Sequence, residues 1–182
     1  IKERTLVKEA MNLDSMKGMV KLVKSIFLMT ISFETVGALL SFISFSKNYS
    51  IADAAGISIF HSIAAFNNSG FDILGGLTNL IPYREDILLN LVTAFLIITG
   101  GLGFLVIKDI IVKRNFKKFT LHTKVVIITT IILLLSGTIL LKMTEKISLL
   151  GAFFFSTSAR TAGFSTYNVG QFTNGGLFVL II

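Results

Sequence analysis

The stretch Ala65-Phe-Asn-Asn-Ser-Gly-Phe-Asp72 decides how this sequence is interpreted, because a second stretch repeats its central feature. Ala159-Arg-Thr-Ala-Gly-Phe-Ser165 also places a Gly-Phe pair after a short run of small or polar residues. Each stretch follows an apolar segment, residues 51–66 or 147–158, that is shorter than the roughly 20 residues of a membrane-spanning helix. Each segment with its stretch therefore predicts a helix that enters a membrane and a polar, extended segment that returns from it.

Such a unit suits a cation site. Non-helical backbone at membrane depth is tolerated only where it is buried in protein or lines a water-filled path. A glycine with positive φ lets successive carbonyl oxygens face one side, and carbonyl oxygens can replace the water shell of a cation. The negative C-terminal end of the preceding helix adds to that attraction. The hypothesis is an ion-selectivity filter formed by two segments: Asn67, Asn68, Ser69, Gly70 and Phe71, and Arg160, Thr161, Ala162, Gly163 and Phe164.

The composition indicates a membrane protein. Of the 182 residues, 53% are hydrophobic and 17 are phenylalanine, whereas a soluble domain is about 45–50% apolar. The chain contains no cysteine, which excludes disulfides and thiolate metal sites. It begins at Ile1 and ends at Ile182 inside an apolar run, so we expect a piece of a longer chain with one membrane span cut.

The basic residues indicate how the chain is oriented. The formal net charge is +7, and two groups of Lys and Arg supply most of it, near the start of the first span and around the link between the second and third spans. These groups are Lys2, Arg4, Lys8, Lys17, Lys21 and Lys24, and Lys108, Lys113, Arg114, Lys117, Lys118 and Lys124. This asymmetry is the positive-inside pattern of a multi-pass plasma-membrane protein. The charge therefore does not indicate a nucleic-acid partner.

The predicted fold is all-α and integral to the membrane, built of repeated units of span, re-entrant pore loop and span. Residues 1–19 form a cytoplasmic, amphipathic lead-in. Residues 20–112 form one pore repeat, with spans over 20–45 and 87–112 around a short helix over 51–66, the first filter segment and an outer loop over 73–86. Residues 113–124 form a cytoplasmic link. Residues 125–182 form a second pore repeat, truncated in its last span, with a span over 125–141 and a short helix over 147–158. Two loops cannot surround an ion, so further loops must complete the ring.

Three features have both structural and functional interpretations. Glu34 lies near the middle of the first span, where an ionisable group is costly. It either hydrogen-bonds to the backbone of a re-entrant loop, which we favour, or binds an ion directly. For His61 and His122 we favour packing over metal ligation, because no second ligand stands at a suitable spacing. Ser50 and Asp53 have the form of a capping box at the start of the first short helix.

The second span contains Thr99-Gly-Gly-Leu-Gly103. These glycines do not form a phosphate loop, because no strand precedes them and no Lys-Ser or Lys-Thr pair follows them. They predict either the close approach of another backbone or a bend in the helix.

Together these motifs resemble the Trk/Ktr/HKT superfamily of potassium transporters, and most closely its KtrB-type (NtpJ-type) bacterial membrane subunit. Asn67-Asn-Ser-Gly-Phe71 is similar to the filter of the second of four repeats, and Arg160-Thr-Ala-Gly-Phe164 to that of the third. Thr99-Gly-Gly-Leu-Gly-Phe104 and Leu121-His-Thr-Lys124 are similar to segments that end the second repeat and begin the third, and Glu9-Ala-Met-Asn-Leu-Asp14 to the lead-in.

The resemblance implies potassium uptake by a transporter with no catalytic site and no covalent cofactor. K⁺ would be held by the backbone carbonyls of Asn68, Ser69, Gly70, Thr161, Ala162 and Gly163, with Na⁺ as a cotransported or activating ion. The implied partners are membrane lipid, a second copy of the subunit in a homodimer, and a cytoplasmic nucleotide-binding regulatory subunit of the KtrA/TrkA type. Arg160 would point away from the pore and pair with an acidic group. The alternatives are a non-conducting structural or sensory subunit with the same fold and, more remotely, an intramembrane enzyme.

Overall fold

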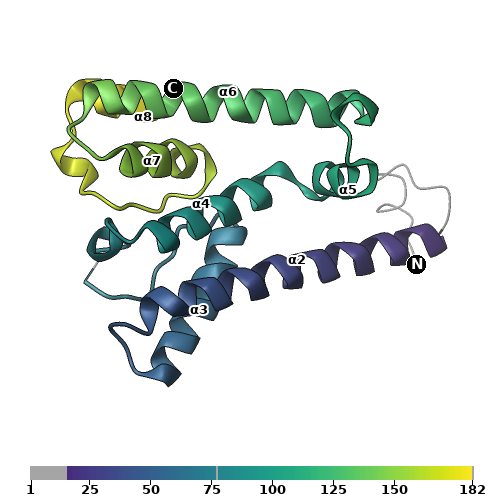
Figure 1. Cartoon of the computed structure of the whole chain (residues 1–182), viewed down its shortest axis with the longest axis horizontal. Helices are drawn as coiled ribbons and strands as arrows, with labels where there is room; N and C mark the ends of the chain where they lie inside the picture. The colour runs from purple at the N-terminus through teal and green to yellow at the C-terminus, as the bar shows by residue number, and fades with distance from the viewer. Residues whose placement is uncertain (1–15, 77, 182) are drawn as a thin grey trace. The chain divides into compact units, whose positions relative to one another are not determined.

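The computed structural model describes residues 16–76 and 78–181, and their secondary structure is entirely helical. The α-helices are α2 (Met16–Phe45), α3 (Ile51–Phe66), α4 (Ile87–Leu102), α5 (Phe104–Lys113), α6 (Leu121–Thr144), α7 (Leu149–Thr161) and α8 (Asn174–Ile181), shown in Figure 1. Short 3₁₀ helices lie in the connections: η1 (Ile81–Tyr83), η2 (Phe116–Lys118) and η3 (Val169–Gln171). The all-α class is thus confirmed, whereas most of the predicted lead-in lies outside the described residues.

The chain divides into two compact units, Ile1–Phe33 and Glu34–Ile182. The described part of the first unit is the N-terminal portion of α2. The second unit contains the rest of α2 and every later helix, including both predicted filter segments.

Among the described residues, two helices have the length and composition to cross a membrane, or three if the bent pair α4 and α5 forms one span. The two are Val20–Phe45 within α2 and Leu121–Thr144, with mean hydropathies of 1.9 and 2.4 over their most apolar windows. Many large apolar side chains of α6 are exposed, as expected for contact with lipid: Val125, Ile128, Ile131, Ile132, Leu135 and Ile139. The start of α6 extends into the predicted link, because the Thr120 hydroxyl accepts the N–H of Thr123 and caps the helix there.

The predicted second span is not one straight helix. It is broken between α4 and α5, whose axes are bent by 99°. Gly103 lies at the break with φ of +82°, a conformation that favours glycine. The bend that the glycine-rich motif allowed for is therefore present within the predicted span over 87–112.

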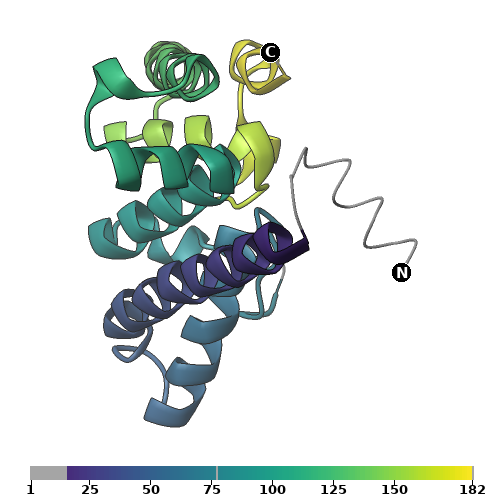
Figure 2. The same ribbon diagram turned by 90° about the vertical axis from the view of Figure 1, so that its right-hand side faces the viewer.

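The short helices lie on either side of α4. Helix α4 packs against both α3 and α7, and α7 in turn packs against α6, which also contacts α8. Figures 1 and 2 both show α7 and α8 lying beside α6. The C-terminal ends of α3 and α7 both reach Gly101 of α4, since a Cβ atom there would lie 3.4 Å from the Asn68 side chain and 3.8 Å from the Thr161 hydroxyl.

The ends of the short helices were predicted unequally well. Helix α3 has the predicted bounds, and Ser50 caps it by accepting the N–H of Asp53 at 3.2 Å while donating to its carboxylate. Helix α7 begins after Ser148, which accepts the N–H of Gly151, and it continues through Thr161. Two residues of the predicted second filter segment, Arg160 and Thr161, therefore belong to the helix rather than to an extended segment.

An ion pair links the end of α2 to the start of α4. The Lys47 ammonium lies 3.2 Å from the Asp86 carboxylate, and Asp86 also accepts the N–H of Leu89 at the first turn of α4. Burial opposes ionisation of Asp86, but these donors hold the pKa of its carboxyl below the usual range. The carboxylate thus stays charged and caps the helix.

Candidate ion-selectivity filter

The two predicted filter segments lie in direct contact. Gly70 has φ of +69°, and a Cβ atom added to it would overlap the carbonyl oxygen of Ala162 and lie 3.2 Å from the carbonyl carbon of Gly163. Just beyond these segments the Leu80 N–H donates to the Ser165 carbonyl at 3.0 Å. Only a residue without a side chain permits this approach, so Gly70 is fixed both by its conformation and by its neighbour.

Asn67 joins the end of α3 to the middle of α2. Its side-chain NH₂ donates to a carboxylate oxygen of Glu34 at 3.1 Å and to the Ile63 carbonyl at 2.9 Å. The backbone carbonyl of Glu34 also accepts the Ser62 hydroxyl at 2.7 Å. Glu34 therefore contacts the end of α3, but the partner of its carboxylate is the side chain of Asn67 rather than the expected loop backbone.

Asn68 attaches the first segment to α4. With its NH₂ group toward the carbonyls of Ala65 and Ile97, both at 3.2 Å, its side-chain oxygen accepts the N–H of Gly101 at 3.3 Å. Its backbone has φ of +54°, which asparagine tolerates better than most residues. On the same helix, a Cβ atom on Gly100 would overlap the Phe66 carbonyl oxygen. The glycine-rich motif of α4 thus provides the predicted close approach to another backbone, the end of α3.

The remaining residues of the first segment are more open. The backbone N–H and the hydroxyl of Ser69 both donate to the Ala64 carbonyl, at 2.9 and 3.1 Å. This turns the chain back over the last turn of α3. Phe71 is 69% exposed.

The second segment is held by the end of its own helix. The N–H groups of Ala162 and Gly163 both donate to the Ser158 carbonyl, and the Ser158 hydroxyl donates to the Phe164 carbonyl at 2.6 Å. Gly163 has φ of +82°, with open space where a Cβ atom would lie. A single serine thus satisfies three backbone groups of the segment.

An aromatic contact connects the second segment to α3. The ring of Phe164 is 2% exposed and lies edge-on to His61, with centroids 5.4 Å apart. The Nε2 atom of His61 lies 2.8 Å from the hydroxyl oxygen of Thr93 on α4, and its ring also contacts Phe45. Packing, the favoured interpretation of His61, is confirmed. His122 is exposed.

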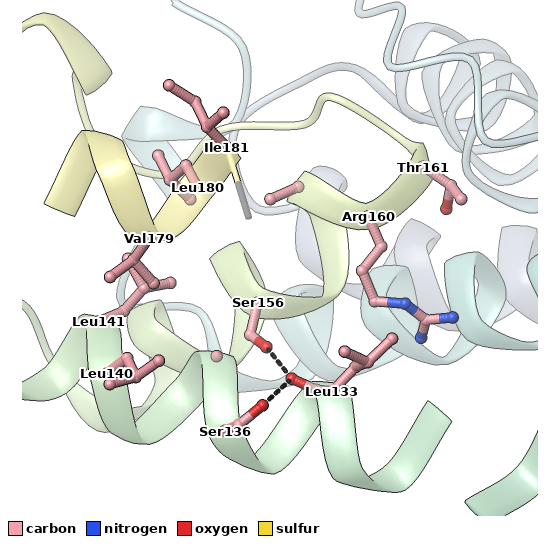
Figure 3. Close-up of a pocket in the computed structure, with 12 residues that line it drawn as sticks. Leu133, Ser136, Leu140, Leu141, Ser156, Arg160, Thr161, Val179, Leu180 and Ile181 are labelled. Carbon is pink, nitrogen blue, oxygen red and sulfur yellow. Dashed lines mark hydrogen bonds between the residues drawn. The ribbon is translucent and has the colours of Figure 1, made fainter. Parts of the chain in front are cut away.

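Arg160 lies apart from the contact between the two segments. Its side chain lies in a groove of about 460 Å³ that is bounded by α6, α7 and α8. Figure 3 shows the guanidinium beside Leu133, whose carbonyl accepts the hydroxyls of Ser136 and Ser156. Within the described residues no carboxylate lies within 4.0 Å of Arg160, so the expected acidic partner is not found there.

Several carbonyl oxygens of the two segments have no hydrogen-bond donor among the described residues. Among the described residues, no N–H or O–H group donates to the carbonyls of Asn68, Ser69, Ala162 or Gly163. The Gly70 carbonyl accepts the side chain of Asn79 at 3.3 Å. Asn79 was expected only as part of the outer loop, and no pattern in the local sequence marks it as a partner of both segments.

The described residues thus form an all-helical membrane protein in which two short helices, α3 and α7, are followed by adjoining glycine-containing segments. Residues 3–147 match the family model TrkH, described as cation transport protein. The chain belongs to this family of cation transporters and is not an enzyme.

Curated relatives cover nearly the whole chain. It is 38% identical to the Ktr system potassium uptake protein B of Bacillus subtilis, with 100% of the chain and 43% of the relative aligned. It is 35% identical to the potassium/sodium uptake protein NtpJ of Enterococcus hirae, with 97% and 41% aligned. The Ktr system potassium uptake protein B of Vibrio alginolyticus is 33% identical over 100% of the chain and 43% of its own length. The chain therefore spans less than half the length of these relatives.

Proposed function

We propose that this chain contributes two segments of the selectivity filter of a potassium uptake protein. Residues 20–112 and 125–182 would be the second and third of four pore repeats, and the remaining repeats would complete the ring. The observation that carries this proposal is the contact between Gly70 and the Ala162–Gly163 backbone, since it joins two similar segments from distant parts of the chain. The potassium uptake named for the relatives supports K⁺ as the ion.

The chemistry of the two segments agrees with cation passage. The free carbonyls of Ser69, Ala162 and Gly163 are neutral oxygen donors that can replace ion-bound water without trapping the cation. The C-terminal ends of α3 and α7, which both approach Gly101 of α4, would add partial negative charge beside the two segments. Glu34, bonded to Asn67, would brace the first segment, and K⁺ would also be held by the carbonyls of Asn68, Gly70 and Thr161.

The proposal includes partners. A homodimer in the membrane, regulated by a cytoplasmic nucleotide-binding subunit, is supported by the resemblance to KtrB-type subunits. Sodium enters as a second ion because one relative is named a potassium/sodium uptake protein. The basic connection around η2 is the part of this chain expected to face the cytoplasm.

The test is potassium uptake by full-length protein in cells that lack their own uptake systems, with the regulatory subunit supplied. Gly70→Ser is compared with wild type at matched membrane levels. The new Cβ penalises the positive φ by about 1–2 kcal/mol and also overlaps the Ala162 carbonyl, so the K⁺ concentration for half-maximal uptake should rise by about tenfold or more. Gly56→Ser is the matched control, because Gly56 lies on α3 with open space around its Cβ position.

Wild-type rescue with a raised K⁺ requirement in Gly70→Ser alone would support the proposal. Unchanged uptake and ion preference in Gly70→Ser would remove Gly70 from the filter. If well-expressed wild-type protein does not restore uptake, the non-conducting structural or sensory subunit becomes the better description.

A further inference from the structure

Asn79 lies between the two filter segments and bonds to both. Its side-chain NH₂ donates to the Gly70 carbonyl at 3.3 Å, and its side-chain oxygen accepts the backbone N–H of Ser165 at 3.0 Å. The same oxygen accepts the N–H of Leu80 at 2.9 Å, and that N–H also faces the Ser165 carbonyl. One amide group thus links residues that flank or belong to segments in different halves of the chain.

The orientation of this amide follows from its neighbours. Two backbone N–H groups can only donate, so they require the oxygen of Asn79 on their side. The Gly70 carbonyl can only accept, so it requires the NH₂ group on the other side. Both ends of the amide are therefore matched, and a residue with only one kind of polar atom cannot replace it.

The backbone at this position also suits asparagine. Asn79 has φ of +50°, in the left-handed region where asparagine, aspartate and glycine are the most readily accommodated residues. The side chain is half-buried, which limits competition from water for its hydrogen bonds. The residue at this position must therefore adopt a positive φ and supply both a hydrogen-bond donor and an acceptor.

We infer that Asn79 is a positioning residue for ion selectivity, which sets the direction of the Gly70 carbonyl and its spacing from the second segment. This inference rests on the proposed filter and extends it to a residue outside both segments. A carbonyl that gives one lone pair to Asn79 is restrained in the direction of the other. Small changes in that direction alter the cavity offered to ions of different size, so loss of the restraint should change ion preference more than uptake capacity.

The experiment compares two substitutions that leave the backbone conformation accessible. Asn79→Gly removes both hydrogen-bonding groups of the side chain, and glycine adopts the required φ without strain. Asn79→Asp keeps the acceptor for Ser165 and Leu80 but replaces the donor to Gly70 with an oxygen that repels the carbonyl. Asn168→Asp is the control, because it makes the same chemical change away from both segments. Asn168 caps η3 by accepting the N–H of Gly170.

The readout is the ratio of half-maximal uptake concentrations for K⁺, Rb⁺ and Na⁺ in full-length protein, with maximal rate and membrane level measured separately. We expect Asn79→Gly to lower the preference for K⁺ over Na⁺ by a factor on the order of five. This factor corresponds to the loss of one to two hydrogen bonds of ordinary strength. Asn79→Asp should shift the preference in the same direction, and Asn168→Asp should leave it unchanged. A purely structural role would lower membrane level or maximal rate without moving the ratios.

The outcomes separate this inference from the proposed function. If Gly70→Ser changes ion preference while both Asn79 variants keep the wild-type ratios, Asn79 is not a positioning residue and the filter stands. If Asn79→Gly does not reach the membrane, Asn79→Asp decides alone. If neither Gly70→Ser nor the Asn79 variants change any ratio in conducting protein, the filter proposal itself fails. An equal shift in Asn168→Asp would assign the effect of Asn79→Asp to added charge, and a wild-type ratio in Asn79→Gly would then overturn the inference.

Discussion

The two Gly-Phe segments share a sequence pattern, but different contacts hold them in place. The first is tied by asparagine side chains to other parts of the fold, with Asn67 bonded to Glu34 and Asn68 to α4. The second is tied by Ser158 of its own helix and by the ring of Phe164. The phenylalanines show the difference most clearly, since Phe71 is 69% exposed and Phe164 is 2% exposed. Similar local sequences in this chain are therefore held in place by different kinds of contact.

The largest effect should come from removing the aromatic anchor. Phe164→Ala would leave a cavity beside His61 and should lower the free energy of unfolding by about 3–5 kcal/mol. Phe71→Ala removes an exposed ring and should change it by less than about 0.5 kcal/mol. Denaturant unfolding of both variants in detergent measures the difference. Equal losses would show that Phe71 is as well packed as Phe164 and would end the contrast between the segments.

A smaller contrast is expected between the two glycines. Gly163→Ala meets only the penalty of a positive φ, about 1–2 kcal/mol, because open space surrounds its Cβ position. Gly70→Ala meets the same penalty and also overlaps the Ala162 carbonyl, which should add about 1–3 kcal/mol. The difference can be measured by unfolding both variants under the same detergent conditions. If Gly163→Ala is the more harmful change, the contact between the segments is not the tighter constraint.

Local signals in the sequence account for part of this fold. The span in α2 and the bounds of α3 follow from apolar length and from the Ser50 cap, which act over a few residues. The second short helix was predicted to end too early, because nothing between Ser158 and Thr161 prevents a helix from continuing. The break between α4 and α5 likewise shows that a glycine-rich motif can indicate a bend without giving its angle.

The contacts that assemble the candidate site could not be read from local patterns. Asn79, the burial of Phe164 against His61, and the overlap at Gly70 all join residues far apart in the sequence. Their partners depend on how α3 and α7 are placed on α4, which periodicity and capping do not specify. Residue types still limited the possibilities, since Gly70 and Gly163 were expected at positive φ and have it.

Arg160 provides the smallest expected effect and the sharpest check on the second segment. It is exposed, ends in the groove beside Leu133, and has no carboxylate within ion-pair distance among the described residues. Arg160→Gln should therefore change the free energy of unfolding by less than about 0.5 kcal/mol and leave the preference for K⁺ over Na⁺ within about twofold. Arg160→Lys retains the charge and serves as the control in the same uptake assay. If Gln alters ion preference strongly while Lys does not, the positive charge acts on the ion path, and the second segment would then select ions through a side chain where the first uses only its backbone.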